Sequence, residues 1–135
     1  MDLVWSVYRR WNNIGGWLVF LVSASVYMLT VEPTVSFWDC GEFILCAFRL
    51  QVGHPPGAPL FIMIGRVATL FAGGDPSKAA MMVNMLSALC SAFTILFLFW
   101  TITHLVRRVF TRSNPLEGSQ IPAIIGSGLL GALAY

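Results

Sequence analysis

Runs of uncharged, mostly apolar residues divide the chain into segments. One run covers residues 14–31 and another covers residues 79–106, and each is long enough to cross the hydrocarbon core of a bilayer as a helix. A third run begins at Gly118 and is still apolar at residue 135, which is typical of a piece of a longer chain. The pattern predicts an all-α integral membrane protein with two full spans and a third, truncated span.

A fourth apolar stretch, residues 58–73, is short and carries Arg66 at its centre. A charge in lipid costs at least about 2.5–3.5 kcal/mol, so this stretch is a poor span. Arginine clusters flank the two full spans: Arg9 and Arg10 before the first, and Arg107, Arg108 and Arg112 after the second. Because both clusters favour the cytoplasm, an even number of crossings separates them. We therefore expect residues 58–73 to lie along the outer membrane surface.

This charge pattern assigns each segment to one side of the membrane. A cytoplasmic N-terminus covers residues 1–13, and an external loop with interfacial helices covers residues 32–78. Residues 107–117 form a cytoplasmic loop, after which residues 118–135 lead outward as the start of the third span. The first span resembles a signal peptide, but no clean small-x-small cleavage site follows it, which favours a retained signal anchor.

Composition agrees with a lipid environment. Hydrophobic residues make up 57% of the chain and charged residues 10%, and the mean hydropathy is +0.76. A soluble domain of 135 residues could not bury so much apolar surface, and the same composition excludes disorder. The net charge of +2, concentrated at helix ends, argues against nucleic-acid binding. Three cysteines without a CxxC pair, and no metal-spaced cluster elsewhere, indicate neither a disulfide framework nor a metal site.

The external loop contains the residues that are best suited to catalysis or binding. If residues 37–50 form a helix, four polar side chains fall on one narrow face: Asp39, Glu42, Cys46 and Arg49. The remaining positions are mostly apolar, which predicts a helix at the membrane surface with one polar stripe. His54 follows, and the two prolines after it force an extended backbone that ends the helix.

Each of these residues also has a structural interpretation. Ser36 and Asp39 have the spacing of a capping box, in which Asp39 only closes the helix N-terminus. Glu42 and Arg49 would then be solvated surface charges, and His54 would sit in a rigid turn. The sequence leaves both sets of roles open, and capping is compatible with catalysis.

Polar and small residues inside the apolar segments favour structural roles. Arg66 can extend its guanidinium to the headgroups, and Asn84, in the second span, is interpreted as a polar group of helix packing. Two small-xxx-small pairs in the third run allow another helix to approach closely: Ser127/Gly131 and Gly128/Ala132. Nothing in the 135 residues assures such a partner helix.

The chain resembles a family of bacterial polytopic membrane proteins in three segments: TVEPTVSFWDCGEF (residues 30–43), LQVGHPPGAPLFIMIGR (residues 50–66) and MVNMLSALCSAFTILFLFW (residues 82–100). That family, long of unknown function, has an animal relative regarded as a protein O-mannosyltransferase and is similar to a branch of the GT-C glycosyltransferases. The strings WDCGEF and HPPGAP are the specific part of the resemblance. It implies the N-terminal part of a GT-C-like enzyme in the bacterial cytoplasmic membrane.

The resemblance implies transfer of a sugar from a polyprenyl-phosphate carrier to an acceptor hydroxyl on the non-cytoplasmic face. Asp39 and Glu42 are the implied catalytic residues, with Asp39 taking the proton of the acceptor. Protein O-mannosyltransferases often place the two acids adjacent, whereas Cys40 and Gly41 separate them here, so the role carries over less directly to Glu42.

The same resemblance suggests residues that bind donor or acceptor. Arg49 and Arg66 are the candidates that hold the charge of the leaving phosphate, and His54 is a candidate contact to either substrate. No metal or other cofactor is required in principle. The expected partners are membrane lipid, the lipid-linked sugar, a protein or glycan acceptor and the remaining spans of a longer chain.

The competing class is a non-enzymatic polytopic membrane protein, such as a transporter subunit or assembly factor, with the loop as a docking surface. A transporter predicts ionisable residues inside the spans, whereas the strongest ones here lie in the loop, which favours the enzyme. One interfacial helix and one turn supply only part of a site for a lipid-linked sugar. Residues 1–135 alone are therefore expected to be inactive.

Overall fold

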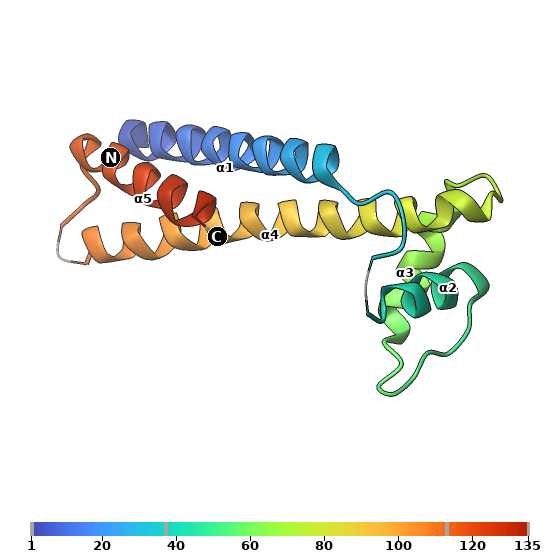
Figure 1. Ribbon diagram of the computed structural model, residues 1–135. Helices are drawn as coiled ribbons and strands as arrows, with labels where there is room; N and C mark the ends of the chain where they lie inside the picture. Colours follow the sequence, from blue (N-terminus) through green and yellow to red (C-terminus); the bar gives the residue numbers. More distant parts are fainter. Residues whose placement is uncertain (1, 37, 113, 135) are drawn as a thin grey trace. The chain divides into compact units, whose positions relative to one another are not determined.

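The computed structural model describes residues 2–36, 38–112 and 114–134. Its elements are five α-helices and two short 3-10 helices (Figure 1): α1 (Asp2–Thr30), α2 (Cys40–Arg49), α3 (Pro59–Leu70), η1 (Pro76–Lys78), α4 (Ala79–Phe110), η2 (Gly118–Gln120) and α5 (Ile121–Leu133). Within the described ranges 78% of the residues are helical and none lies in a strand, which confirms the predicted all-α class.

Within the described part of the chain, two helices are long and apolar enough to cross a membrane, Leu3–Thr30 and Pro76–Phe110. They contain the two predicted spans, apart from Val31 at the end of the first. The first helix begins well before residue 14, because no proline or glycine interrupts the segment that precedes it. α3, with 12 residues, is about 18 Å long and too short to cross a bilayer of about 30 Å. The side of the membrane on which each loop lies stays a prediction.

The chain divides into two compact units. The first combines Met1–Val26 with Ser91–Tyr135, and the second is Tyr27–Cys90. The second unit contains the whole of α2 and α3 together with the first turns of α4, and therefore all the candidate site residues from Asp39 to Arg66.

Glycines allow close helix packing in the first unit. A Cβ added at Gly15 of α1 would lie 2.9 Å from the ring of Phe99 in α4, where an ordinary contact is 3.4–4 Å. A Cβ added at Gly16 would likewise overlap the indole of Trp100. Phe99 is fully buried, so this glycine face of α1 is where the two long helices of the unit meet.

The small residues of α5 find their partner helix within the chain. A Cβ added at Gly128 would meet Phe99 and Thr103 of α4, and one added at Gly131 would meet Ile102. The sequence assured no such partner, because its pattern shows which helix face is small but not which helix covers it.

In the second unit, α2 and α3 pack against each other and against α4. The buried core consists of apolar side chains from these helices: Ile44, Ala47, Ala80 and Val83, with Phe61 packed against them. A Cβ added at Gly65 of α3 would lie 2.9 Å from the Cβ of Ala47 in α2. Glycine at this position therefore sets how closely the two helices approach.

Helix α2 is shorter than the predicted residues 37–50. Trp38 has a φ of 67°, in the left-handed region, so a right-handed helix cannot run through it. Asp39 is consequently the N-cap residue, and its side chain makes no capping hydrogen bond. The capping box predicted for Ser36 and Asp39 is wrong, since the helix begins three residues too late for Ser36 to cap it. The Asp39 carboxylate is not used to close the helix.

Candidate functional site

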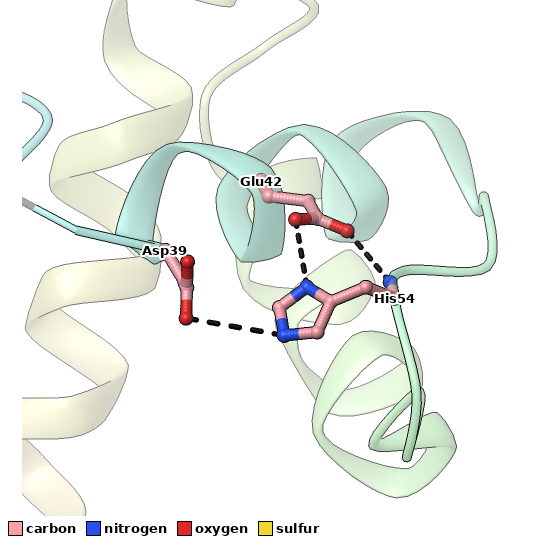
Figure 2. A group of neighbouring side chains, drawn as sticks. All are labelled: Asp39, Glu42 and His54. Carbon is pink, nitrogen blue, oxygen red and sulfur yellow. Dashed lines mark hydrogen bonds and ion pairs between the residues drawn. The ribbon is translucent and has the colours of Figure 1, made fainter.

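Asp39, Glu42 and His54 converge beside the first turn of α2 (Figure 2). Asp39 precedes that turn, Glu42 belongs to it, and His54 comes from the loop between α2 and α3. Their side chains are 48%, 42% and 47% exposed, respectively. The sequence predicted all three as candidates, and the structure brings them together in one accessible cluster.

Glu42 holds His54 through both carboxylate oxygens. Oε1 accepts the backbone N–H of His54 at 2.7 Å, and Oε2 lies 2.8 Å from the ring Nδ1. Gly53 leaves room for this contact, because a Cβ there would lie 3.2 Å from Glu42 Oε1. A carboxylate beside Nδ1 favours a proton on that nitrogen. Glu42 thus fixes both the backbone and the ring orientation of His54.

The other ring nitrogen of His54 faces Asp39. Nε2 lies 3.9 Å from Asp39 Oδ2, within ion-pair distance but beyond that of a hydrogen bond. Figure 2 shows the imidazole between the two carboxylates, bonded to Glu42 and facing Asp39. The two acids therefore have different tasks available to them: the Glu42 oxygens are occupied by His54, whereas Asp39 makes only the longer contact to it.

The contacts between Glu42 and His54 shift both pKa values. Hydrogen bonds from the His54 backbone N–H and ring hold the pKa of Glu42 below its ordinary value. The hydrogen bond to Glu42 and the charge of that carboxylate raise the pKa of His54, and the charge of Asp39 acts in the same direction. His54 consequently stays protonated to a higher pH than a solvated histidine.

Arg49 and Arg66 gather at the opposite end of α2. Each guanidinium carbon lies 5.9 Å from the centre of the Phe48 ring, and Arg66 Nη1 also donates to the Phe48 carbonyl. Ten residues of helix place Arg49 roughly 15 Å along the axis from Asp39. The structure therefore separates the two predicted phosphate-binding arginines from the carboxylates. Arg66 also closes the C-terminal end of α2, a contact that its sequence environment did not indicate.

Apolar side chains are exposed next to Asp39 and along α3. Trp38, next to Asp39 in the chain, is 93% exposed. The exposed face of α3 carries apolar residues every three or four positions: Leu60, Met63, Ile64, Val67 and Leu70. An interfacial helix requires such a face, because it buries its apolar side in the headgroup region of a membrane.

The same three residues offer a set of metal ligands. One oxygen from each of Asp39 and Glu42 and one nitrogen of His54 lie within 4.8 Å of one another, close enough to hold one ion. Sequence spacing did not indicate this set, because His54 reaches the acids only through the fold of the loop. The expectation that the protein requires no metal stays a prediction.

Comparison with known proteins gives a consistent result. The family described as "Protein O-mannosyl-transferase TMEM260 N-terminal domain" matches residues 39–135. The chain is 38% identical over 116 residues to "Protein O-mannosyl-transferase TMEM260" of Mus musculus, covering 85% of the chain and 14% of that protein. It is 29% identical over 85 residues to "Protein O-mannosyl-transferase tmem260" of Dictyostelium discoideum, covering 63% of the chain and 10% of that protein. The chain thus spans 10–14% of the length of these relatives, and no solved structure matches it.

Proposed function

The chain belongs to the family of protein O-mannosyl-transferase TMEM260 N-terminal domains, and from this membership we propose that it supplies the N-terminal part of a membrane glycosyltransferase of the GT-C type. The complete protein would transfer a sugar from a polyprenyl-phosphate carrier to an acceptor hydroxyl on the non-cytoplasmic face. The names of the relatives favour mannose as the sugar and a protein as the acceptor. The observation that carries the proposal is the exposed Asp39–Glu42–His54 cluster inside the matched residues.

The proposed reaction is a single displacement at the anomeric carbon. The acceptor oxygen forms a bond to that carbon, and the bond from the carbon to the phosphate oxygen breaks. Polyprenyl phosphate leaves with the electron pair, and the hydroxyl proton passes to Asp39. A hydroxyl is a poor nucleophile near neutral pH, so a base at the acceptor is the first requirement. Attack opposite the leaving group inverts the anomeric configuration.

Asp39 suits the role of base better than Glu42. Its side chain is half exposed, and the helix does not use its carboxylate as a cap. Glu42 is engaged by His54 at 2.7 and 2.8 Å, which holds its pKa below the ordinary value and makes it a weaker base. Glu42 is therefore proposed as a positioning residue for His54.

His54 is proposed to supply positive charge to the donor. The leaving phosphate requires a cation, and the two arginines lie at the far end of α2. Because Glu42 raises the pKa of His54, the imidazolium, which lies beside the base, persists to a higher pH than in a solvated histidine. Arg49 and Arg66 would then contact the donor phosphate only if the lipid-linked sugar extends along α2.

The exposed apolar surface supports the proposal that the donor substrate reaches the site from the membrane. Trp38 and the apolar face of α3 would place the cluster at the depth of the headgroups, where the phosphate of a lipid-linked sugar also lies. The remaining walls of the site would come from the rest of the complete protein.

A substitution of Asp39 in the complete protein tests the proposal. Asp39→Asn keeps the shape and removes the base, so we expect sugar transfer from a polyprenyl-phosphate donor to fall by about 10²–10⁴-fold. Asp75→Asn is the matched control: Asp75 caps η1 by accepting the Ser77 N–H at 3.0 Å, and asparagine caps about as well. Equal transfer rates for the two folded variants would refute the assignment of Asp39.

A further inference from the structure

The side chain of Asn84 links α4 to the loop that leads into the candidate site. Its Nδ2 donates to the carbonyl of Glu32 at 2.8 Å and to the carbonyl of Thr34 at 2.9 Å. The sequence favoured a role in helix packing for Asn84, but its amide bonds to the loop that follows α1. All three residues belong to the second unit of the chain.

The loop held by Asn84 is a preformed turn. The Glu32 carboxylate accepts the backbone N–H of Thr34 at 3.1 Å and also the Thr34 hydroxyl. Pro33 lies between them, and its ring fixes one backbone torsion. In this turn the carbonyls of Glu32 and Thr34 both point toward the side-chain nitrogen of Asn84. Losing that amide would release the turn from α4 without removing the contacts inside the turn.

Val35 connects this turn to the first turn of α2. A Cβ added at Gly41 would lie 3.2 Å from Val35 Cγ1, so Val35 packs directly on the glycine. Gly41 stands between Asp39 and Glu42 in the sequence. Asn84 also lines a cavity of about 130 Å³ together with the α2 residues Cys40 and Phe43. A continuous set of contacts therefore runs from α4 to the backbone that carries both acids.

We infer that Asn84 is a positioning residue for Asp39, acting through the Glu32–Thr34 turn and the contact of Val35 with Gly41. This inference rests on the proposed function. Asp39 makes no capping bond, and its side-chain contact within the described residues is the 3.9 Å approach to His54. Its position is therefore set by the backbone around it, and a misplacement of about 1 Å at a reacting group costs on the order of 10²-fold in rate.

Asn84→Asp in the complete protein is the direct test. Aspartate has nearly the same size, but it replaces the donor amide by oxygens that repel the two carbonyls. We expect kcat for sugar transfer to fall by about 10–10²-fold, with KM for the polyprenyl-phosphate sugar nearly unchanged. Ser87→Ala is the control, because among the residues that the structure describes the Ser87 hydroxyl donates within its own helix, to the Val83 carbonyl at 3.2 Å. Turnover by Asn84→Asp equal to that of Ser87→Ala would overturn the inference.

Two further variants separate positioning from loss of fold. Gly41→Ala disturbs the same contact from the α2 side, so it should lower kcat as Asn84→Asp does. If Asn84 acts through Asp39, adding Asn84→Asp to Asp39→Asn should cause no further loss, whereas an equal further loss would overturn the inference. Normal transfer by Asp39→Asn itself would instead overturn the proposed function, and this inference with it. The two failures are therefore distinguishable.

Discussion

Gly65→Ala is predicted to separate α2 from α3. The new Cβ would lie 2.9 Å from the Cβ of Ala47, and the two helices must move apart by about 0.5–1 Å to restore an ordinary contact. Overpacking of this kind costs about 1–3 kcal/mol. Alanine recovers about 1 kcal/mol through its higher helix propensity. The free energy of unfolding of the second unit should therefore fall by about 0–2 kcal/mol.

The reverse substitution isolates the contact. Ala47→Gly removes the methyl group that Gly65→Ala would meet, so the double variant should lack the overlap. Denaturant titration of both single variants and the double variant in detergent micelles gives the coupling energy, which we expect to be about 1–3 kcal/mol in favour of the double variant. Transfer by Gly65→Ala should also be reduced, because α2 carries Glu42 and follows Asp39.

A simple result would refute this reasoning. If Gly65→Ala raised stability by the full helix-propensity gain of about 1 kcal/mol, and the double variant showed no coupling, the two helices would not be in contact at this glycine. The placement of the acids by packing of α2 on α3 would then lose its support.

Three other predictions concern the site and the topology. Glu42→Gln removes the negative charge and one of the two acceptor oxygens that raise the pKa of His54, so the pKa returns toward 6.5. If transfer needs the imidazolium, the rate falls as pH rises through that pKa, and the alkaline limb of kcat/KM should move to lower pH in the variant; an unchanged limb would contradict the role of His54. In a cysteine-free background, a membrane-impermeant maleimide should label a cysteine at position 52 in intact cells but not one at position 117, and the opposite pattern would reverse the topology. Purified residues 1–135 should show no transfer from polyprenyl-phosphate donors. Clear turnover would show that the active site needs no residues outside this segment.

Much of the fold follows from patterns that are local in the sequence. The uncharged runs predicted α1 and α4, because a membrane span needs only length and apolar composition. The end of α2 fell within one residue of the prediction, but at the left-handed Leu50, five residues before Pro55, rather than at the prolines. The start of α2 did not, because the left-handed backbone of Trp38 depends on the surrounding loop rather than on any turn residue.

Contacts between segments that are distant in the sequence could not be predicted from it. The spacing of Asp39 and Glu42 indicated a shared helix face, but the pairing of Glu42 with His54 joins a residue of α2 to one in the loop after it, twelve positions further along the chain. Likewise, Arg66 donates to the backbone carbonyl of Phe48. Every residue has such a carbonyl, so the sequence pattern cannot show which one is the partner. Asn84 is a similar case. Its residue type shows that the side-chain amide can donate two hydrogen bonds, but not that the carbonyls of Glu32 and Thr34 accept them.

The most direct test of the account is the product of transfer by the complete protein. The purified protein in liposomes, supplied with polyprenyl-phosphate-linked mannose and an acceptor peptide, should form a glycoside whose anomeric configuration is inverted relative to the donor, as NMR of the product would show. Transfer with retained configuration would contradict a single displacement with Asp39 as base. Absence of transfer from any lipid-phosphate sugar would contradict the proposed function as a whole.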